Sequence, residues 1–400
     1  MSPLLLSHFT ASSCLGLGLD ATLAALKARR SGLKPCQFET VHDLQTHVGE
    51  VEGVDGVALP DALADFDCRN NRLALLGIEQ DGFGDAVRAA VARHGRRRVG
   101  VLLGTSTSGI LQTEQAYRRR DPATGALPAD FHYRTTHNTY SVGDFVRSYF
   151  DLEGPAMVVS TACSSSAKVF ASAARMITAG LIDAAIVGGV DSLCLTTLYG
   201  FNSLELLSMR PCRPYDADRD GLSIGEAAAY ILLERAPAQV GAADILLLGA
   251  GESSDAHHMS APHPEGLGAR MAMQAALDSA GLEVSAVDYL NLHGTATPSN
   301  DAAEGKAVAG LFGDRVACSS TKAATGHTLG AAGGMEAVIC ALVLRHGFMP
   351  GGAHLDRLDP AIAIDYLAAN REQAPRRALS NSFGFGGSNC SLLLGRGDAE

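Results

Sequence analysis

The chain has 400 residues, of which 46% are hydrophobic and 19% charged. This composition predicts a folded globular protein and excludes a disordered one. The formal net charge is −11, and because nucleic acid requires a basic face, we expect no nucleic-acid partner. The arginine runs at residues 96–98 and 118–120 are local exceptions. Most such runs are solvated surface, although a small basic patch is also suited to an acidic carrier.

The nine cysteines are scattered without a CxxC pair, which predicts neither a disulfide framework nor a zinc site and favours reduced thiols in the cytoplasm. The N-terminus carries no basic segment ahead of its apolar residues, and no apolar run approaches the roughly 20 residues that cross a bilayer. We therefore expect no export signal and no membrane span.

Short apolar runs alternate with Ala- and Leu-rich segments along the chain, which predicts an α/β fold. In chain order we expect a helix at 73–78, a strand at 99–104, a helix at 167–179, strands at 184–189 and 229–233, a helix at 270–280, a strand at 287–292 and a helix at 333–344. Segment 236–241 is rich in helix and strand breakers, so it predicts a boundary between a half spanning residues 1–236 and a half spanning residues 237–400.

The two halves resemble each other in the order of their elements. A helix leads into a strand that ends at Leu103-Gly104-Thr105 in the first half and at Leu292-His293-Gly294 in the second. A strand, a small-residue loop and an Ala-rich helix follow in each, at 158–174 and 316–344. Duplication would bring Cys163 and His293 to one central crevice, because ligand sites gather beyond the carboxyl ends of strands. Chance similarity between two glycine-rich halves is the alternative.

Cys163 stands where an apolar strand gives way to a small-residue helix, in the sequence VVSTACSSS at 158–166. The free N–H groups and partial positive charge of a helix start favour the thiolate, which attacks carbonyl carbons, and the same N–H groups suit an oxyanion. We therefore expect a nucleophile. The alternative is a buried structural cysteine.

Two histidines follow strands in glycine-rich turns of the second half. His293 lies in HGTATP, and His327 lies five residues after Lys322 in KAATGH. Glu336, on the next helix, lies fourteen residues beyond Lys322. One cation and one anion beside an imidazole would fix its tautomer and keep it neutral. The alternatives are a satisfied polar histidine and a structural salt bridge.

The run NSFGFGGSN at 381–389 has glycines that let backbone N–H groups approach a bound carbonyl, and Phe383 and Phe385 could wall an apolar pocket. Such a run is more often a turn alone. No phosphate-cradling motif occurs in the sequence. His257, His258 and His263 match no usual zinc spacing, so we expect no metal.

Five motifs in this order resemble the elongating β-ketoacyl-acyl-carrier-protein synthases, types I and II, of the thiolase superfamily. The resemblance covers residues from about 99 to about 394. The motifs are TAC at 161–163, PYDADRDG at 214–221, HGT at 293–295, STK at 320–322 with GH at 326–327, and NSFGFGG at 381–387.

The resemblance implies a thiolase-like fold, with two βαβαβαββ halves stacked in five layers, α-β-α-β-α, and usually a dimer. It implies that Cys163 takes an acyl chain from an acyl carrier protein as a thioester. A malonyl group on a second carrier then loses carbon dioxide and attacks the thioester, which gives a 3-oxoacyl product two carbons longer. Because both substrates arrive on a phosphopantetheine arm, we expect no cofactor of the enzyme's own.

The resemblance also implies a role for each site residue. The histidines, His293 and His327, would stabilise the enolate, and the N–H groups of Cys163 and Phe383 would form the oxyanion hole. Lys322 and Glu336 would support His327. The other implied roles are binding of the phosphopantetheine arm for Thr295 and Thr297, a gate for Phe201 and Phe383, and the acyl pocket for Ser108. Phe201 and Phe385 are also expected to bind substrate or its arm, and Arg69 and Arg72 to dock the carrier.

Three departures from the family pattern favour a specialised polyketide or polyene pathway over primary fatty-acid synthesis. Serines follow Cys163 at 164–166, residues 105–108 are rich in hydroxyls, and Glu205 stands where relatives often have an arginine. The sequence leaves open a homodimer or a heterodimer with a chain-length-factor-like paralogue. A degradative thiolase would need a second cysteine in a Cys-Gly-Gly run, and a non-condensing partner would lack Cys163.

Overall fold

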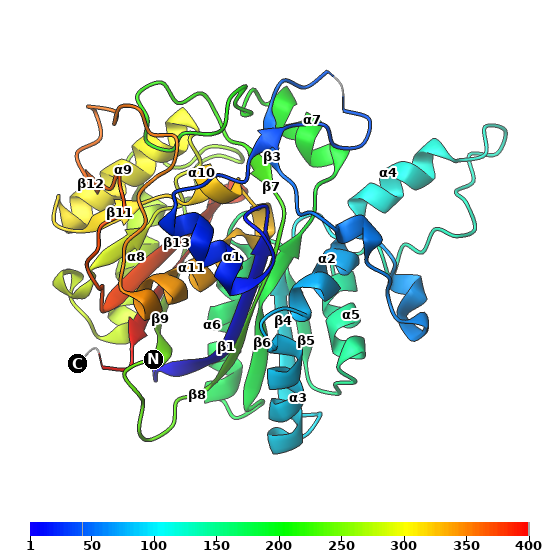
Figure 1. Cartoon of the computed structure of the whole chain (residues 1–400), viewed down its shortest axis with the longest axis horizontal. Helices are drawn as coiled ribbons and strands as arrows, with labels where there is room; N and C mark the ends of the chain where they lie inside the picture. The colour runs from blue at the N-terminus through cyan, green and yellow to red at the C-terminus, as the bar shows by residue number, and fades with distance from the viewer. Residues whose placement is uncertain (42, 399–400) are drawn as a thin grey trace.

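The structure is a computed structural model that describes residues 1–41 and 43–398. Two half-sheets with the same strand order form its centre (Figure 1). The first has the order β5-β4-β6-β8-β1 and the second β11-β10-β13-β14-β9, with the short β12 at the outer edge. The bounds are β1 Leu4–Ser13, β4 Val99–Gly104, β5 Ala156–Val159, β6 Ala184–Asp191, β8 Ala227–Arg235, β9 Ile245–Ser254, β10 Tyr289–Asn291, β11 Ala317–Ser319, β12 Asp365–Tyr366, β13 Arg377–Gly384 and β14 Ser388–Arg396.

The strand directions repeat as well. β4 is parallel to both of its neighbours, while β6, β8 and β1 alternate in direction. β10 is likewise parallel to both neighbours, and β13, β14 and β9 alternate. Leu4 and Leu5 of β1 pair with Leu247 and Leu246 of β9, which joins the halves into one 11-stranded sheet.

Helices complete a five-layer stack. Between the half-sheets lie α6 (Ser165–Thr178) and α11 (Ala332–His346), which contact each other and strands of both halves. The first half is covered on its outer face by α2 (Arg69–Ile78), α3 (Phe83–His94) and α5 (Ser141–Tyr149). The second is covered by α8 (Leu267–Ala280) and α9 (Pro298–Phe312). This is the predicted α-β-α-β-α arrangement.

The central position of α11 explains its composition. Leu329–His346 is long and apolar enough to pass for a membrane span, but 89% of it is buried inside the protein. A helix that packs on all sides against sheets and another helix needs no polar face.

Of the remaining elements, α1 packs against β1 and α11. A three-stranded sheet has the order β2-β3-β7. Figure 1 shows α4 and the loop after it extending away from the half-sheets. The bounds are α1 Gly18–Lys27, α4 Ile110–Arg118, α7 Leu195–Ser203, α10 Lys322–Thr325, β2 Lys34–Pro35, β3 His47–Gly49 and β7 Ile224–Gly225.

Every helix and strand expected from the sequence is present, with shifts at the ends. The strand expected at 287–292 is shorter, because β10 spans only Tyr289–Asn291. The helix expected from residue 73 begins four residues earlier, at Arg69. Segment 236–241 lies in the loop between β8 and β9, and the division of the chain there stays a prediction. Arg96, Arg97 and Arg98 each pair with an acidic side chain, as a solvated run would.

Candidate active site

Cys163 lies in a tight turn between β5 and α6. Ala162, just before it, has a φ of 52°, a left-handed conformation that non-glycine residues seldom adopt and that often marks a functional turn. Ser165 locks the turn: its hydroxyl donates to the carbonyl of Ala162 and accepts the N–H of Thr161 at 2.8 Å. Gly104, at the end of β4, must lack a side chain, since a Cβ there would lie 2.2 Å from the nitrogen of Ser166. The turn therefore fits directly onto the sheet.

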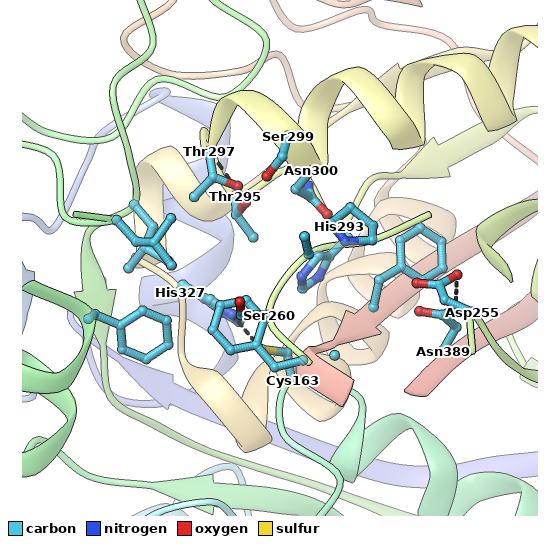
Figure 2. Close-up of a pocket in the computed structure, with 18 residues that line it drawn as sticks. Cys163, Asp255, Ser260, His293, Thr295, Thr297, Ser299, Asn300, His327 and Asn389 are labelled. Atoms are coloured by element: carbon cyan, nitrogen blue, oxygen red, sulfur yellow. Dashed lines mark hydrogen bonds between the residues drawn. The ribbon is translucent and has the colours of Figure 1, made fainter. Parts of the chain in front are cut away.

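His327 lies against the nucleophile. Its Nε2 is 2.9 Å from the Cys163 Sγ (Figure 2). The backbone fixes this position, because the His327 N–H donates to the carbonyl of Ser223 and its carbonyl accepts the N–H of Gly225. Both groups are buried. A neutral imidazole at this distance is placed to take the thiol proton.

His293 completes a triad with Cys163 and His327. It follows β10, the strand that pairs with β11, so both histidines come from the second half-sheet and Cys163 comes from the first. Its ring lies edge-on to that of His327, with centroids 5.3 Å apart. Glu304 holds the His293 turn by accepting the N–H groups of His293 and Gly294, each at 2.8 Å. The Nζ of Lys322 lies 3.4 Å from the His293 Nδ1. An ammonium there donates to Nδ1, which leaves the proton on Nε2 as a donor toward the pocket.

Electrostatics keep both imidazoles neutral. Burial, and then the charge of Lys322, hold the pKa values of His293 and His327 well below the usual range for histidine. Neutral imidazoles are the form that can accept the thiol proton or donate one N–H to an enolate. The triad is therefore in the required state at neutral pH.

The thiol of Cys163 is not in the state that the sequence predicted. Burial raises its pKa to about 11, although Lys322 and the N–H groups at the turn oppose the shift. Desolvation disfavours a buried anion more than the helix start favours it. The expected resting thiolate is therefore wrong, and deprotonation must be coupled to His327.

Lys322 and Glu336 form a buried ion pair beneath the triad. Burial raises the pKa of Glu336 to about 7, with Lys322 opposing the shift. The sequence assigned this pair to His327, but the lysine contacts His293 instead. The reason is that α10 begins at Lys322 and directs its side chain toward the His293 turn, while His327 follows the helix.

The two phenylalanines of the glycine-rich run exchange their expected roles. The backbone N–H that donates a hydrogen bond to the Cys163 sulfur belongs to Phe385 and not to Phe383. The ring of Phe385 packs 5.7 Å from that of Phe201, whereas the ring of Phe383 packs 5.8 Å from that of His293. The N–H beside the sulfur and the ring against Phe201 therefore belong to Phe385, so the expected N–H contact of Phe383 is wrong, while a gate at Phe383, which lines the pocket, stays a prediction.

The triad lines a pocket together with residues from both halves of the chain. Figure 2 shows Thr295 and Thr297 on one side, near Ser299 and Asn300, with their hydroxyls 2.9 Å apart. Asp255, which accepts a hydrogen bond from Asn389, lies on the other side. Apolar side chains that include Phe201 wall the rest. Such a pocket suits an acyl chain carried on a polar arm.

Known proteins share this architecture. Residues 79–238 match the family model described as Beta-ketoacyl synthase, N-terminal domain, and residues 245–356 match Beta-ketoacyl synthase, C-terminal domain. The chain is 31% identical to the 3-oxoacyl-[acyl-carrier-protein] synthase 2 of Vibrio cholerae over 96% of both chains. It is 39% identical to the synthase of that name from Rhizobium meliloti over 74% of both.

The chain belongs to the β-ketoacyl synthase family. Its fold is similar to that of the ketosynthase ApeO, solved in complex with its chain length factor ApeC, from Xenorhabdus doucetiae, with a TM-score of 0.89 and 38% identity over 99% of this chain and 98% of that one. A β-ketoacyl synthase from Burkholderia phymatum gives a TM-score of 0.87 and 28% identity over 99% and 100%. The predicted thiolase-like fold and the predicted condensing acyltransferase activity are confirmed.

Arg69 does not serve this ketosynthase as a docking cation. Its side chain is 3% exposed and binds three acids: Glu226, Asp55 and Glu50. Arg69 begins α2, and its guanidinium points inward to the buried Glu226. The prediction for Arg69 is therefore wrong. Arg72 is 27% exposed and pairs with Asp67, and its role in docking stays a prediction.

Ser108 does not line the pocket either. It is buried, and its hydroxyl donates to the carbonyls of Thr136 and Asn138, both at 2.9 Å. Ser108 therefore holds the segment that follows α4, and nothing in its position supports contact with substrate at the described pocket.

Two buried carboxylates that organise the site were missed by the sequence analysis. Glu304 holds the His293 turn, and one oxygen of Asp191 accepts the N–H groups of Ser106 and Thr107 and the hydroxyls of Thr105 and Thr107. Asp191 also accepts the N–H of Gly330, next to the His327 turn. For Asp191 the signal was an acid at the end of an apolar strand, β6, because a charge in that position needs several donors. Glu304 lies within α9 and has no such local signal.

The raised pKa of Cys163 gives a testable result. We expect iodoacetamide to alkylate Cys163 about tenfold faster for each pH unit gained between about pH 6.5 and about pH 9, because the thiolate fraction rises in that proportion below the pKa. Mass spectrometry of the peptide that contains Cys163 measures the rate, with a small free thiol as the control. A rate that is flat above pH 7 would show that the thiolate already exists at neutral pH.

Proposed function

We propose that this ketosynthase is the active, acyl-accepting subunit of an assembly that elongates chains on acyl carrier protein, with Cys163 as nucleophile. The observation that carries the proposal is the 2.9 Å contact between the Cys163 Sγ and His327 Nε2. A non-condensing partner would have no use for it. We also propose that the reaction needs no cofactor of the enzyme's own and that it takes place in the cytoplasm, which the nine free cysteines favour.

Acylation begins with transfer of the thiol proton from Cys163 to His327. The thiolate attacks the carbonyl carbon of the carrier thioester, and the N–H groups of Cys163 and Phe385 stabilise the oxyanion. When the carbon–sulfur bond to the carrier breaks, the His327 imidazolium keeps on Nε2 the proton that it took from Cys163 and releases its Nδ1 proton, and the leaving pantetheine thiolate takes up a proton in return. His327 is then neutral again, as the next step requires.

Decarboxylation follows on a malonyl thioester. Loss of carbon dioxide leaves an electron pair that spreads onto the thioester oxygen as an enolate. We propose that the Nε2–H groups of His293 and His327, whose rings lie edge-on to each other, donate hydrogen bonds to this oxygen, and that Lys322 fixes the His293 tautomer. The enolate carbon attacks the acyl group on Cys163, and the sulfur leaves as the 3-oxoacyl product forms.

An exposed sheet edge supports a partner subunit. β5 is the last strand of the first half-sheet, and in the part of the chain that the structure describes it pairs only with β4. Met157 on this edge is 41% exposed, and Tyr133, in the segment beyond α4, is 58% exposed. An open strand edge with apolar side chains invites pairing. Because ApeO was solved with its chain length factor, we propose a paralogous partner and a polyketide or polyene pathway.

The proposal is tested by assembly and turnover together. The purified chain, alone and co-expressed with a candidate paralogue, is incubated with acyl- and malonyl-loaded carrier protein. We expect carbon dioxide, a ketoacyl product two carbons longer and a heterodimer by native mass spectrometry. A homodimer that is fully active alone would contradict the paralogous partner, and no product from a range of donors in either form would contradict the active-subunit role.

The rim of the pocket suits a carrier with an apolar contact surface. Met259 is 78% exposed next to the pocket-lining Ser260, and its carbonyl accepts the N–H of Gly386 in the glycine-rich run. Met209 is 65% exposed and Leu204 51% exposed, near Leu206, which also lines the pocket. Since carriers are acidic, a new carboxylate on this rim would repel them.

We therefore expect Met259→Glu to raise the KM for carrier-bound substrates about 3- to 10-fold with little change in kcat. Met271→Glu is the matched control, because Met271 is 50% exposed but lies on α8 and does not line the pocket. Steady-state kinetics with a carrier-bound donor measure both variants. Equal KM values would place the docking surface elsewhere.

A further inference from the structure

The triad is also a set of metal-ligand atoms. One atom each from Cys163, His293 and His327 lies within 4.8 Å of the other two, and all three residues are buried. Lys322 takes the Nδ1 of His293, so the nitrogen of that ring left for a ligand is Nε2. We propose that the triad binds a zinc ion reversibly and that zinc is thereby an inhibitor that competes with acylation.

The spacing of the atoms fits zinc. Zinc lies about 2.3 Å from sulfur and about 2.0–2.1 Å from nitrogen in tetrahedral sites, which places neighbouring ligand atoms about 3.3–3.7 Å apart. The distance from the Cys163 Sγ to the His327 Nε2, 2.9 Å, is slightly shorter than this spacing, and no two of the three ligand atoms are more than 4.8 Å apart. Small rotations of the two rings, on the order of 1 Å at the nitrogens, would produce the tetrahedral spacing.

The donor set and its surroundings also suit this ion. Thiolate and imidazole are the ligands zinc prefers, and three protein ligands leave a fourth position for water. That position faces the pocket, which Ser260 and Asn300 line. The charge of Lys322 is compensated by its ion pair with Glu336. Binding replaces two protons with the metal, that of the Cys163 thiol and that on the His293 Nε2, and releases both to solvent, while the Lys322 ammonium stays hydrogen-bonded to the Nδ1 of the deprotonated ring.

Metal and acyl group exclude each other. Zinc on the Cys163 sulfur removes the lone pair that attacks the donor, and a thioester on that sulfur removes the ligand that zinc requires. Zinc should therefore raise the apparent KM for the acyl donor. The inference rests on the geometry of the triad and needs neither the carrier nor the partner of the proposed function.

A second histidine pair gives the control. The ring centroids of His257 and His263 lie 5.2 Å apart in the segment that contains the pocket-lining Ser260, with His257 exposed and His263 half-buried. Exposed histidine pairs bind divalent metals weakly through nitrogen alone. Sulfur ligation distinguishes the triad from this pair.

The test uses cobalt(II) as a spectroscopic probe and zinc as its competitor. We expect wild-type protein to show a sulfur-to-cobalt charge-transfer band that stoichiometric zinc abolishes, and His257→Ala to keep it. Cys163→Ser should lose the band, and so should wild-type protein first acylated on Cys163. By isothermal titration we expect His327→Ala to bind zinc at least 10-fold more weakly, since even outer-shell changes cost that much. A thermal melt without metal checks that each variant folds.

Two results would overturn the inference. One is a charge-transfer band that survives both Cys163→Ser and acylation, which would assign the metal to another cysteine. The other is wild-type protein with no such band and no measurable zinc affinity. Neither readout depends on turnover, so failure here is distinguishable from failure of the proposed function.

Discussion

Cys163→Ala is expected to abolish acyl-enzyme formation and to lower condensation at least ~10⁴-fold. The alanine removes the only sulfur that has an imidazole nitrogen at 2.9 Å and a backbone N–H from the glycine-rich run beside it, among the residues that the structure describes. Binding of the carrier substrates should persist, because the pocket and its rim are unchanged. Intact-protein mass spectrometry after incubation with an acyl-carrier donor measures the loss as a missing mass increment.

Cys390→Ala is the matched control. Cys390 is also a buried free thiol, but it lies in β14 and does not line the pocket. We expect this variant to take up the acyl group as the wild type does. If Cys163→Ala still gains the acyl mass, another residue is the nucleophile and the mechanism proposed here is wrong.

The fold and the triad were predictable because their signals are local. A small-residue turn after an apolar strand made Cys163 a candidate, glycine-rich turns after strands did so for His293 and His327, and the resemblance of five ordered motifs to the condensing enzymes decided among the alternatives. Strands such as β4 and β6 are buried along their whole length, and a continuous apolar run predicts that environment without knowledge of the neighbours. The repeated order of elements supplied the crevice that brings the three residues together.

The failed predictions concern features that depend on distant residues. Arg69 is buried because Glu226, 157 residues away, lies opposite it, and no local pattern reveals such a partner. The Cys163 pKa depends on how completely the turn is buried, which a sequence does not display. Local signals of helix charge were outweighed by that burial.

The exchange between Phe383 and Phe385 has a different cause. Phe383 lies in β13 and pairs with Asn389 of β14, whereas β13 ends at Gly384 and Phe385 begins a short 3₁₀ turn. A residue beyond the end of the strand has an N–H group that the sheet does not use, so it is available to the sulfur. The resemblance assigned the N–H to Phe383 by motif position, and a motif does not show at which of the two phenylalanines the strand ends.

The two histidines should separate in function. In a Cys163→Gln background, which isolates decarboxylation from acylation, we expect His293→Ala and His327→Ala each to slow carbon dioxide release from malonyl carrier by about 10²- to 10³-fold, as loss of one oxyanion donor does. With Cys163 intact, only His327→Ala should also slow acylation, because His327 alone of the pair contacts the sulfur, while His293 contacts Lys322.

Two assays measure these effects: carbon dioxide release and the rate of acyl mass gain. His94→Ala is the control, since that imidazole pairs with Glu234 and does not line the pocket, and it should leave both rates unchanged. Normal decarboxylation in both active-site variants would remove the histidines from enolate stabilisation. If both variants slow acylation equally, the thiol proton is shared across the triad. The contact of His327 alone with the sulfur would then make no difference to the rate of acylation.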